Sequence, residues 1–200
     1  MSISQEKTRK RYERIAPVFD MMDRMIRSSW RENMVAKAEG EVLEIGVGTG
    51  ANLPYYTKKV NKVTAIDFSP AMLKQAERKK QKAAIPVELK EMDAEELQFS
   101  DDSFDTVVTA CVFCSVPDPV KGLKEIKRVL KPGGRVYMLE HMRSENPLGG
   151  KLMDGLNPLI VRLWGANINR RTMENISAAG LEVQEEKHLM GKIMRELTLA

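Results

Sequence analysis

The sequence predicts a single-domain α/β fold in which helices cover both sides of a mostly parallel, seven-stranded sheet with an antiparallel end strand. Short apolar and β-branched runs alternate with helical segments, and turns rich in glycine or proline separate them. The chain has 200 residues, of which 42% are hydrophobic and 30% charged, so it has enough material for one full core.

The N-terminal part is expected to be helical and to lead into the first strand. Residues 5–37 carry a helical pattern that breaks near Pro17, and Gly40 ends this segment. The apolar run 41–45 then predicts the first strand, which is followed by a short helix over residues 54–57.

The middle of the chain repeats the order strand, helix, strand. Residues 62–66 are apolar enough for a second strand. Ser69 and Pro70 open the next helix, because serine caps a helix well and proline suits its first position. We expect this helix to reach residue 82 and a third strand to span residues 87–91.

The fourth strand is expected to lie at the centre of the sheet, because residues 104–111 are nearly all apolar or β-branched. Asp118, followed by proline, opens a helix over residues 120–130. The Lys-Pro-Gly-Gly segment 131–134 stops that helix, and residues 135–140 predict the fifth strand.

The C-terminal part does not continue this regular alternation of strands and helices. Residues 149–165 predict an amphipathic helix, kinked by Pro158, that serves as a lid over a substrate pocket or as a surface that dips into a bilayer. Residues 171–179 predict a short helix, and residues 181–189 and 194–200 predict two closing strands. The apolar positions of the amphipathic helix are Leu152, Met153, Leu156, Leu159, Ile160, Leu163 and Trp164.

Composition and charge indicate the compartment in which the protein is expected to work and the partners that it is expected to bind. The sequence has no run of 18 apolar residues and no apolar core in its polar N-terminal segment, so we expect neither a membrane span nor a signal peptide. Its two cysteines suit a reducing cytoplasm. Basic clusters at 7–14, 74–82 and 121–135 favour solvated helix faces or peripheral contact with an anionic membrane. Interleaved aromatic residues are missing, which makes nucleic acid an unlikely partner.

The segment 42–50, Val-Leu-Glu-Ile-Gly-Val-Gly-Thr-Gly, reads as a buried strand that runs into a glycine turn. Gly46, Gly48 and Gly50 allow positive φ angles and a close approach of a ligand to the backbone. One carboxylate, Glu44, lies just before this turn. A second, Asp67, ends the next apolar run, close to the position at which dinucleotide-binding proteins carry the acidic residue that binds a ribose. This layout predicts a nucleoside site, and a dinucleotide such as NAD fits the turn as well.

Three features favour S-adenosyl-L-methionine over a dinucleotide. Glu44 places a negative charge beside the turn, which repels a pyrophosphate and attracts a cationic ligand. Asp93 follows the third strand, where a polar group can bind an adenine amine. A chain of this length also leaves little room for a separate substrate domain. An NAD(P)-dependent oxidoreductase remains the alternative.

At these motifs the chain resembles class I S-adenosylmethionine-dependent methyltransferases of the type 11 subgroup, with a Rossmann-like fold. The resemblance covers about residues 10–145. Its motifs are Val42–Gly50, Ile66-Asp-Phe-Ser-Pro-Ala-Met72, Asp93-Ala94, Ser103-Phe-Asp-Thr-Val107 and Val129-Leu-Lys-Pro-Gly-Gly134.

The resemblance implies a role for each cofactor-binding residue. Glu44 and the glycine turn hold the methionine part, with Cys111 and the loop after it nearby. Asp67 takes the ribose hydroxyls, with Phe68 next to it. The remaining implied contacts are Met72 near the adenine, Asp93 on the adenine amine and the Ala94 amide beside it. Tyr12 is expected either to close over the cofactor or substrate or to pack between helices.

It also divides the chain into a helical cap (1–38), a cofactor-binding core (39–141), a substrate lid (142–178) and closing strands (179–200). Residues 11–20 look like the opening of quinone-biosynthesis and bacterial phospholipid N-methyltransferases. The later stretches 114–116, 137–141 and 166–170 are more similar to membrane-associated thiol methyltransferases and their bacterial relatives. The acceptor is therefore expected to be small or lipid-like: a thiol, an amine headgroup or a quinone-like ring.

Methyl transfer to a thiol or an ammonium group requires removal of a proton from the acceptor. His141, at the end of the fifth strand, is the candidate base, and Glu140 is expected to orient it or to face the acceptor.

Cys111 and Cys114 have zinc-like spacing, but no second pair accompanies them, so no metal is expected. A protein that binds the cofactor or a membrane without turnover is a further alternative. The sequence leaves the choice between monomer and dimer open.

Overall fold

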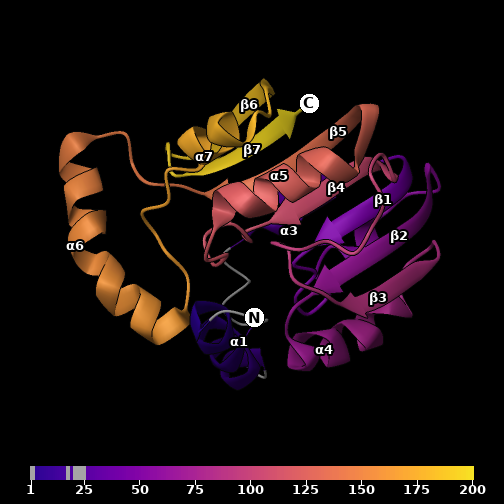
Figure 1. The fold of residues 1–200 in the computed structure, drawn as a ribbon, viewed down its shortest axis with the longest axis horizontal. Helices are drawn as coiled ribbons and strands as arrows, with labels where there is room; N and C mark the ends of the chain where they lie inside the picture. The colour runs from indigo at the N-terminus through magenta and orange to yellow at the C-terminus, as the bar shows by residue number, and fades with distance from the viewer. Residues whose placement is uncertain (1–2, 17–18, 20–25) are drawn as a thin grey trace.

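Seven strands form one sheet in the computed structural model, which describes residues 3–16, 19 and 26–200 (Figure 1). The strand order is β3-β2-β1-β4-β5-β7-β6. The first five strands run parallel, and β7 pairs antiparallel with both β5 and β6, which confirms the predicted fold class. The strands are β1 Gly40–Ile45, β2 Val60–Asp67, β3 Val87–Glu91, β4 Phe104–Ala110, β5 Leu130–His141, β6 Val183–Met190 and β7 Met194–Leu199.

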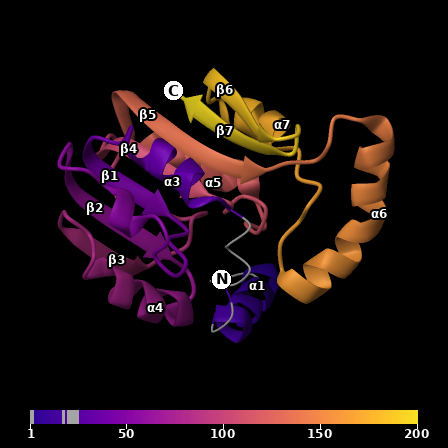
Figure 2. The same cartoon turned by 180° about the vertical axis from the view of Figure 1, so that it is seen from behind.

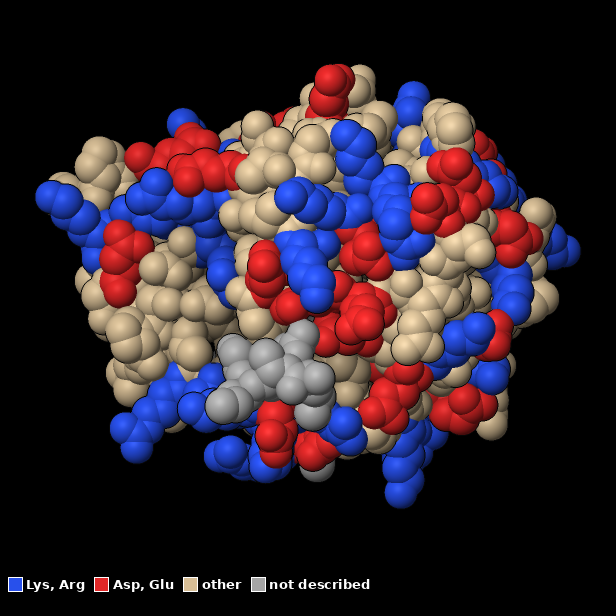
Figure 3. Space-filling view, viewed as in Figure 1, with Lys and Arg blue, Asp and Glu red and all other residues tan. Residues whose placement is uncertain are grey.

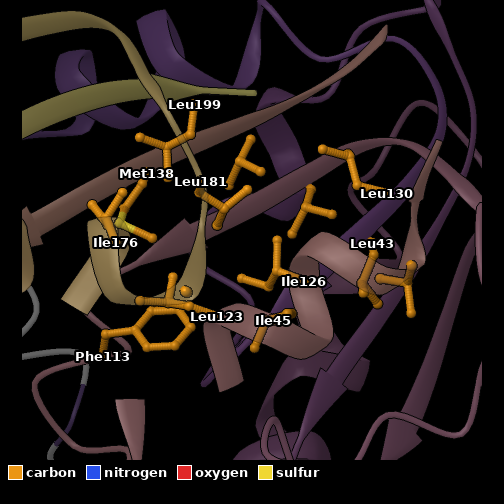
Figure 4. Close-up of a cluster of buried hydrophobic side chains, with 14 of the residues drawn as sticks. Leu43, Ile45, Phe113, Leu123, Ile126, Leu130, Met138, Ile176, Leu181 and Leu199 are labelled. Carbon is orange, nitrogen blue, oxygen red and sulfur yellow. The ribbon is translucent and has the colours of Figure 1, made fainter. Parts of the chain in front are cut away.

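Helices cover both faces of this sheet. On one face, α5 and α7 pack over the central strands, with Leu123, Ile126 and Ile176 fully buried (Figure 4). On the opposite face, Met34 and Val35 of α3 and Ala76 of α4 pack over the sheet (Figure 2). The helices are α1 Ile3–Ile15, α3 Ser28–Val35, the 3₁₀ turn η2 Leu53–Tyr55, α4 Pro70–Lys80, α5 Pro119–Val129, α6 Pro147–Trp164 and α7 Thr172–Ala179.

The register brings the strand ends together at one edge. Ile45 at the end of β1 pairs with Ile66 of β2 and with Thr109 of β4. The strand order reverses between β1 and β4, and the loops that follow these two strands diverge there. In open α/β sheets, such a point leaves a crevice at the carboxyl ends of the strands.

The predicted helix starts are confirmed in α4 and α5. Ser69 Oγ accepts a hydrogen bond from the backbone N–H of Met72 at 3.4 Å, and Asp118 Oδ1 accepts from the N–H of Lys121 at 3.0 Å. A proline occupies the first turn of both helices. Local sequence chemistry is sufficient to start these helices.

Three predicted elements were wrong in extent. The helix expected over 54–57 is the 3₁₀ turn η2, because Tyr56 is extended and its side chain reaches a buried carboxylate. The fifth strand begins at Leu130, ahead of the predicted start at 135, because Leu130 already pairs with Phe104 of β4 and the Lys-Pro-Gly-Gly segment forms an irregularity within the strand. The helical segment 5–37 contains the separate helices α1 and α3, and the break expected near Pro17 lies outside the described residues.

Helix α6 stands beside the sheet rather than on it (Figures 1 and 2). Its inner side is held by polar contacts: Asp154 accepts from Arg143 at 2.8 Å, and Asn157 donates to Asn167 at 3.1 Å. Its outer side carries leucines that are 44–81% exposed, and none of the α6 side chains that the structure describes lines the large cavity described below. These leucines are Leu148, Leu152, Leu156, Leu159 and Leu163, hereafter the leucine face.

The lid role therefore stays a prediction, and the apolar side of this helix faces outward in the structure. The side chain of Trp164 lies outside the described residues. Within the described part of the chain, no helix is both long enough and apolar enough to cross a bilayer.

Candidate functional site

A cavity opens at the carboxyl ends of β1, β2 and β4, where the strand order reverses. It encloses about 950 Å³, part of it open to solvent. Its wall comes from residues 45–49, 51–52, 66–68, 92–94, 110–112 and 115–117, together with residue 19 and individual residues of α1, α3 and α4. The structure thus brings together loops that follow four different strands.

The glycine turn after β1 requires its glycines. Gly46 and Gly50 have φ angles of +65° and +81°, a region that side chains with a Cβ rarely adopt. A Cβ at Gly46 would lie 2.5 Å from Val112 Cγ2, and one at Gly50 would lie 3.1 Å from the backbone of Ala76. Gly48 has a φ of +55° and lines the cavity. The turn therefore exposes backbone to whatever occupies the cavity.

Glu44 points away from this cavity into the protein. It is 1% exposed, and its two carboxylate oxygens accept hydrogen bonds from Asn52 Nδ2 at 2.9 Å and from Tyr56 Oη at 3.0 Å. Burial raises the pKa of Glu44 to about 7. The sequence predicted direct contact with a ligand, whereas the structure places Glu44 beneath the turn, where it holds Asn52 and Tyr56.

Arg31 of α3 completes this network and was not identified from the sequence. Its Nη1 donates to Asn52 Oδ1 at 2.8 Å, and both residues line the cavity. Arg31 is 6% exposed, and arginine is rarely buried to this degree without partners. A signal existed in the sequence: Glu44 lies two residues after the apolar Val42 and so shares its buried face of β1, where a carboxylate needs polar partners. Asn52, two residues after Gly50, is one such partner close in the sequence.

Asp67 lies at the end of β2 and lines the cavity as expected. Its Oδ2 accepts from the backbone N–H of Gly48 at 2.9 Å, and its Oδ1 accepts from the N–H of Ser69 at 2.9 Å. Burial raises its pKa to about 6 although these backbone donors lower it. The carboxylate thereby fixes the glycine turn after β1 and the start of α4 together.

The other predicted cofactor residues line the same cavity. Phe68 lies just before α4 and Met72 in its first turn, and Met72 is 1% exposed. Asp93 and Ala94 follow β3, and Asp93 Oδ1 accepts from the backbone N–H of Glu95 at 2.9 Å. All lie around one cavity, although the chain separates them widely.

Helix α1 closes over this cavity. The Tyr12 hydroxyl is hydrogen bonded to Ser115 Oγ, and its ring packs edge-on against Phe68 with the ring centroids 5.7 Å apart. Burial raises the pKa of the Tyr12 hydroxyl far above its ordinary value. Gln75 of α4 donates to the Ala16 carbonyl at the end of α1. These contacts fasten α1 to both sides of the opening.

The loop after β4 is fixed by Glu140 from below. Glu140 Oε1 accepts from the backbone N–H groups of Val112 at 2.9 Å and of Phe113 at 3.2 Å. Glu140 is fully buried, and burial raises its pKa to about 7. The loop carries Cys111, whose φ of +55° is unusual for a side chain with a Cβ. Cys111 lines the cavity, whereas Glu140 does not reach it.

His141 also lies outside the cavity wall. It ends β5 opposite Met194 of β7, and burial lowers its pKa. Adjacent residues of a strand point to opposite faces, so Glu140 and His141 diverge, and no hydrogen bond between them occurs among the described residues. The expectation that Glu140 orients His141 is therefore not met. A catalytic role for His141 stays a prediction.

The raised pKa of Glu140 predicts how stability depends on pH. The folded state holds the proton up to about pH 7, whereas the unfolded chain releases it near its ordinary pKa of 4.5. Glu140 therefore lowers stability as the pH rises through this window. We expect Glu140→Gln to be more stable relative to wild type at pH 8 than at pH 5, by about 1–3 kcal/mol, in urea unfolding.

Glu125→Gln is the matched control. Arg128 lowers the pKa of Glu125 below its ordinary value, so the contribution of this residue is present throughout pH 5–8. Its variant should differ from wild type equally at both pH values. An equal difference at the two pH values for Glu140→Gln would contradict the proton held at that site.

Comparison with known proteins places this site in a family. The family of methyltransferase domains matches residues 43–138. A phosphatidylethanolamine N-methyltransferase of Cereibacter sphaeroides is 46% identical over 112 residues, which are 54% of this chain and 55% of that protein. A demethylmenaquinone methyltransferase of Lactobacillus johnsonii is 33% identical over 94% of this chain and 86% of its own length.

Among solved structures, a DhpI-SAM-HEP complex has a TM-score of 0.75 with 20% identity, over 100% of this chain and 99% of that one. Because the two sequences are only 20% identical, this similarity shows a shared fold and not a shared activity. The family match, the relative that the chain covers almost throughout, and the fold agree with one another. The chain therefore belongs to the class I S-adenosylmethionine-dependent methyltransferases.

Proposed function

We propose that the protein binds S-adenosyl-L-methionine in the large cavity and transfers its methyl group to a lipid-like acceptor at a membrane surface. The observation that carries the cofactor assignment is the convergence of the glycine turn, Asp67 and Asp93 on one cavity. The named relatives methylate phosphatidylethanolamine and demethylmenaquinone, which supports an acceptor of lipid character. The family match also argues against the dinucleotide alternative.

The residues of the wall fit the parts of this cofactor. Each Asp67 oxygen accepts one backbone N–H and keeps a lone pair for a ribose hydroxyl. Phe68 and Met72 supply the apolar surface that an adenine needs, and Asp93 supplies an acceptor for its amine. The guanidinium of Arg31 beside the glycine turn suits the carboxylate of the methionine part. Glu44 then acts indirectly, by orienting Asn52.

For methyl transfer, the protein mainly has to orient the two reactants and to exclude water from them. Bound S-adenosyl-L-methionine supplies a methyl group on a sulfonium, whose loss leaves a neutral thioether. In-line displacement depends on alignment of donor and acceptor, and a dry site favours it. Helix α1 provides that exclusion, with Tyr12 fastened to Ser115 across the opening. Glu140 contributes as a positioning residue through the amides of Val112 and Phe113.

The leucine face of α6 supports an acceptor held at a membrane. Its five leucines lie at i, i+4, i+8, i+11 and i+15, so they share one side of the helix. The polar contacts of α6 fasten the other side to the body of the protein. A helix normally buries its apolar side, and an apolar side turned outward marks an interaction surface.

Charge favours an anionic phospholipid bilayer as the partner of this face. Lys151 and Arg162 are exposed on α6 and flank the leucines. Asp154, the one acidic residue of the helix, is engaged with Arg143 and Asn169. Figure 3 shows an uncharged area over α6 that lysine and arginine side chains border above and below, with acidic side chains also present at its upper edge. Leucines flanked by cations are typical of helices that lie in a bilayer interface.

The cofactor assignment predicts that Asp67→Asn weakens the binding of S-adenosylhomocysteine about tenfold to hundredfold. The variant loses charge-assisted hydrogen bonds to the ribose, each of which contributes about 1.5–3 kcal/mol. Calorimetric titration measures the change, with Asp102→Asn at an exposed turn as the control. Binding of NADH in place of S-adenosylhomocysteine would overturn the assignment.

The proposed role of His141 predicts that His141→Ala lowers turnover by about 10²-fold or more, while cofactor affinity stays unchanged. A base acts on the acceptor and contributes nothing to cofactor binding. Methyl transfer from labelled cofactor, with thiols, amines, phospholipid headgroups and quinols as acceptors, measures turnover. Unaltered turnover with the true acceptor would remove His141 from the mechanism.

The leucine face predicts that the protein co-sediments with vesicles containing phosphatidylglycerol and less with pure phosphatidylcholine. Leu152→Gln/Leu159→Gln should weaken this binding at least about tenfold, because each leucine contributes about 1.5–3 kcal/mol on burial. Val183→Ser/Met190→Ser, at exposed apolar positions of β6, is the matched control and should bind as wild type does. A wild-type protein that stays in solution, or dimerises through this face, would contradict the membrane contact.

A further inference from the structure

The loop after β4, residues 111–117, is held by two different parts of the chain. Most of this loop lines the cofactor cavity. Glu140 of β5 accepts hydrogen bonds from two of its backbone N–H groups. The segment 165–170, which follows α6, donates to two of its backbone carbonyls. The position of this part of the cavity wall therefore depends on a segment that does not itself line the cavity.

Asn167 donates twice to one carbonyl of this loop. Its backbone N–H reaches the Cys114 oxygen at 2.8 Å, and its side-chain Nδ2 reaches the same oxygen at 2.9 Å. A carbonyl oxygen has two lone pairs, so these two bonds fill its capacity. Arg170 adds one further bond, from Nη2 to the Val116 carbonyl at 2.6 Å. The loop is thereby fastened at the carbonyls on either side of Ser115, which lines the cavity.

Asn167 is in turn held by Asn157 of α6. Asn157 Nδ2 donates to Asn167 Oδ1 at 3.1 Å, and Asn157 Oδ1 accepts from the backbone N–H of Ile168 at 2.9 Å. Because a backbone N–H can only donate and a carbonyl can only accept, the two ends of this chain fix the direction of both side-chain amides. Helix α6 thus reaches the cavity wall at Cys114 through one ordered chain of hydrogen bonds.

The loop that this chain holds adjoins the glycine turn after β1. A Cβ at Gly46 would lie 2.5 Å from Val112 Cγ2, so the loop packs directly against the turn. Cys111, at the start of the loop, has a φ of +55°, and such a backbone conformation persists only where its surroundings enforce it. In the proposed function, the glycine turn receives the methionine part of the cofactor. A shift of this loop would therefore change that end of the site first.

On the basis of the proposed function, we infer that Asn167 is a positioning residue for the methyl donor: together with Asn157, it holds the loop after β4 against the methionine part of the cofactor. Asn167 does not line the cavity, so it acts only through the loop. The polar side of α6 then serves the cofactor site, and the leucine face on its other side stays open to a partner.

Two ligands that share an adenosine separate this role from a general loss of stability. S-adenosylhomocysteine carries the amino-acid part of the cofactor, whereas methylthioadenosine lacks it. In calorimetric titration, Asn167→Ala should weaken the binding of S-adenosylhomocysteine about threefold to tenfold and leave the affinity for methylthioadenosine unchanged. A smaller folded fraction would affect both ligands alike.

Two further variants test the chain of hydrogen bonds. Asn157→Ala should act in the same direction, and the double variant should be little weaker than Asn167→Ala alone, because both substitutions break one chain. Asn169→Ala is the matched control in the same segment. Asn169 Nδ2 donates to Asp154 of α6 at 3.0 Å, and Asn169 makes no hydrogen bond to the loop after β4 within the described part of the chain. This variant should bind both ligands as wild type does.

Alkylation of the Cys114 thiol by iodoacetamide, followed by mass spectrometry, tests the loop without any cofactor. Cys114 is 6% exposed, and burial raises the pKa of its thiol to about 12, so it reacts only when the loop opens. We expect labelling to be about fivefold faster in Asn167→Ala than in wild type, and unchanged in Asn169→Ala.

Equal weakening of both ligands, or unchanged affinity and labelling in Asn167→Ala, would overturn the positioning role and leave the proposed function standing. A wild-type protein that does not bind S-adenosylhomocysteine would overturn the proposed function, and the positioning role with it.

Discussion

Carboxylates buried at the ends of strands hold the loops around the cofactor cavity. Glu44 fixes Asn52 after the glycine turn, Asp67 fixes the turn and the start of α4, and Glu140 fixes the loop after β4. Each is buried enough for its pKa to rise, to about 7 for Glu44 and Glu140 and to about 6 for Asp67. Burial of charge is costly, and here it keeps three loops in one geometry. The chain thus gives up stability near neutral pH to shape the cavity.

Much of the cofactor cavity could be predicted because its signals are local. A glycine turn after an apolar strand, and serine with proline at a helix start, each follow from a few neighbouring residues. The direction of Glu44 was harder, because its partners Asn52 and Tyr56 reach it only after the glycine turn has folded the chain back. Arg31, which holds Asn52 in place, comes from a helix on the other side of β1 in the sequence. The divergence of Glu140 and His141 was accessible in principle, since neighbours on a strand point to opposite faces.

The orientation of helix α6 could not be predicted from its sequence for a different reason. The spacing of its leucines predicts an amphipathic helix correctly, but periodicity does not say which side faces the protein. The side chains that decide this are polar: Asp154 and Asn157 find partners in the loops at 143 and 167–168. Those loops are positioned by the sheet, so no short stretch of sequence contains the answer. These contacts turn Asn157 and the half-buried Met153, Ile160 and Val161 toward the protein, and the five leucines are left outside.

Helix α6 and the wall of the cofactor cavity come together at Gly165, directly after α6. Gly165 has a φ of +82°, and a Cβ there would lie 3.5 Å from Arg11 and 3.6 Å from the Tyr12 ring. Helix α6 therefore ends against α1, the helix that closes over the cofactor cavity (Figure 1). Tyr12 in turn reaches Ser115 on the loop after β4. Any partner that holds the leucine face of α6 would therefore also constrain α1, because the two helices meet at this glycine.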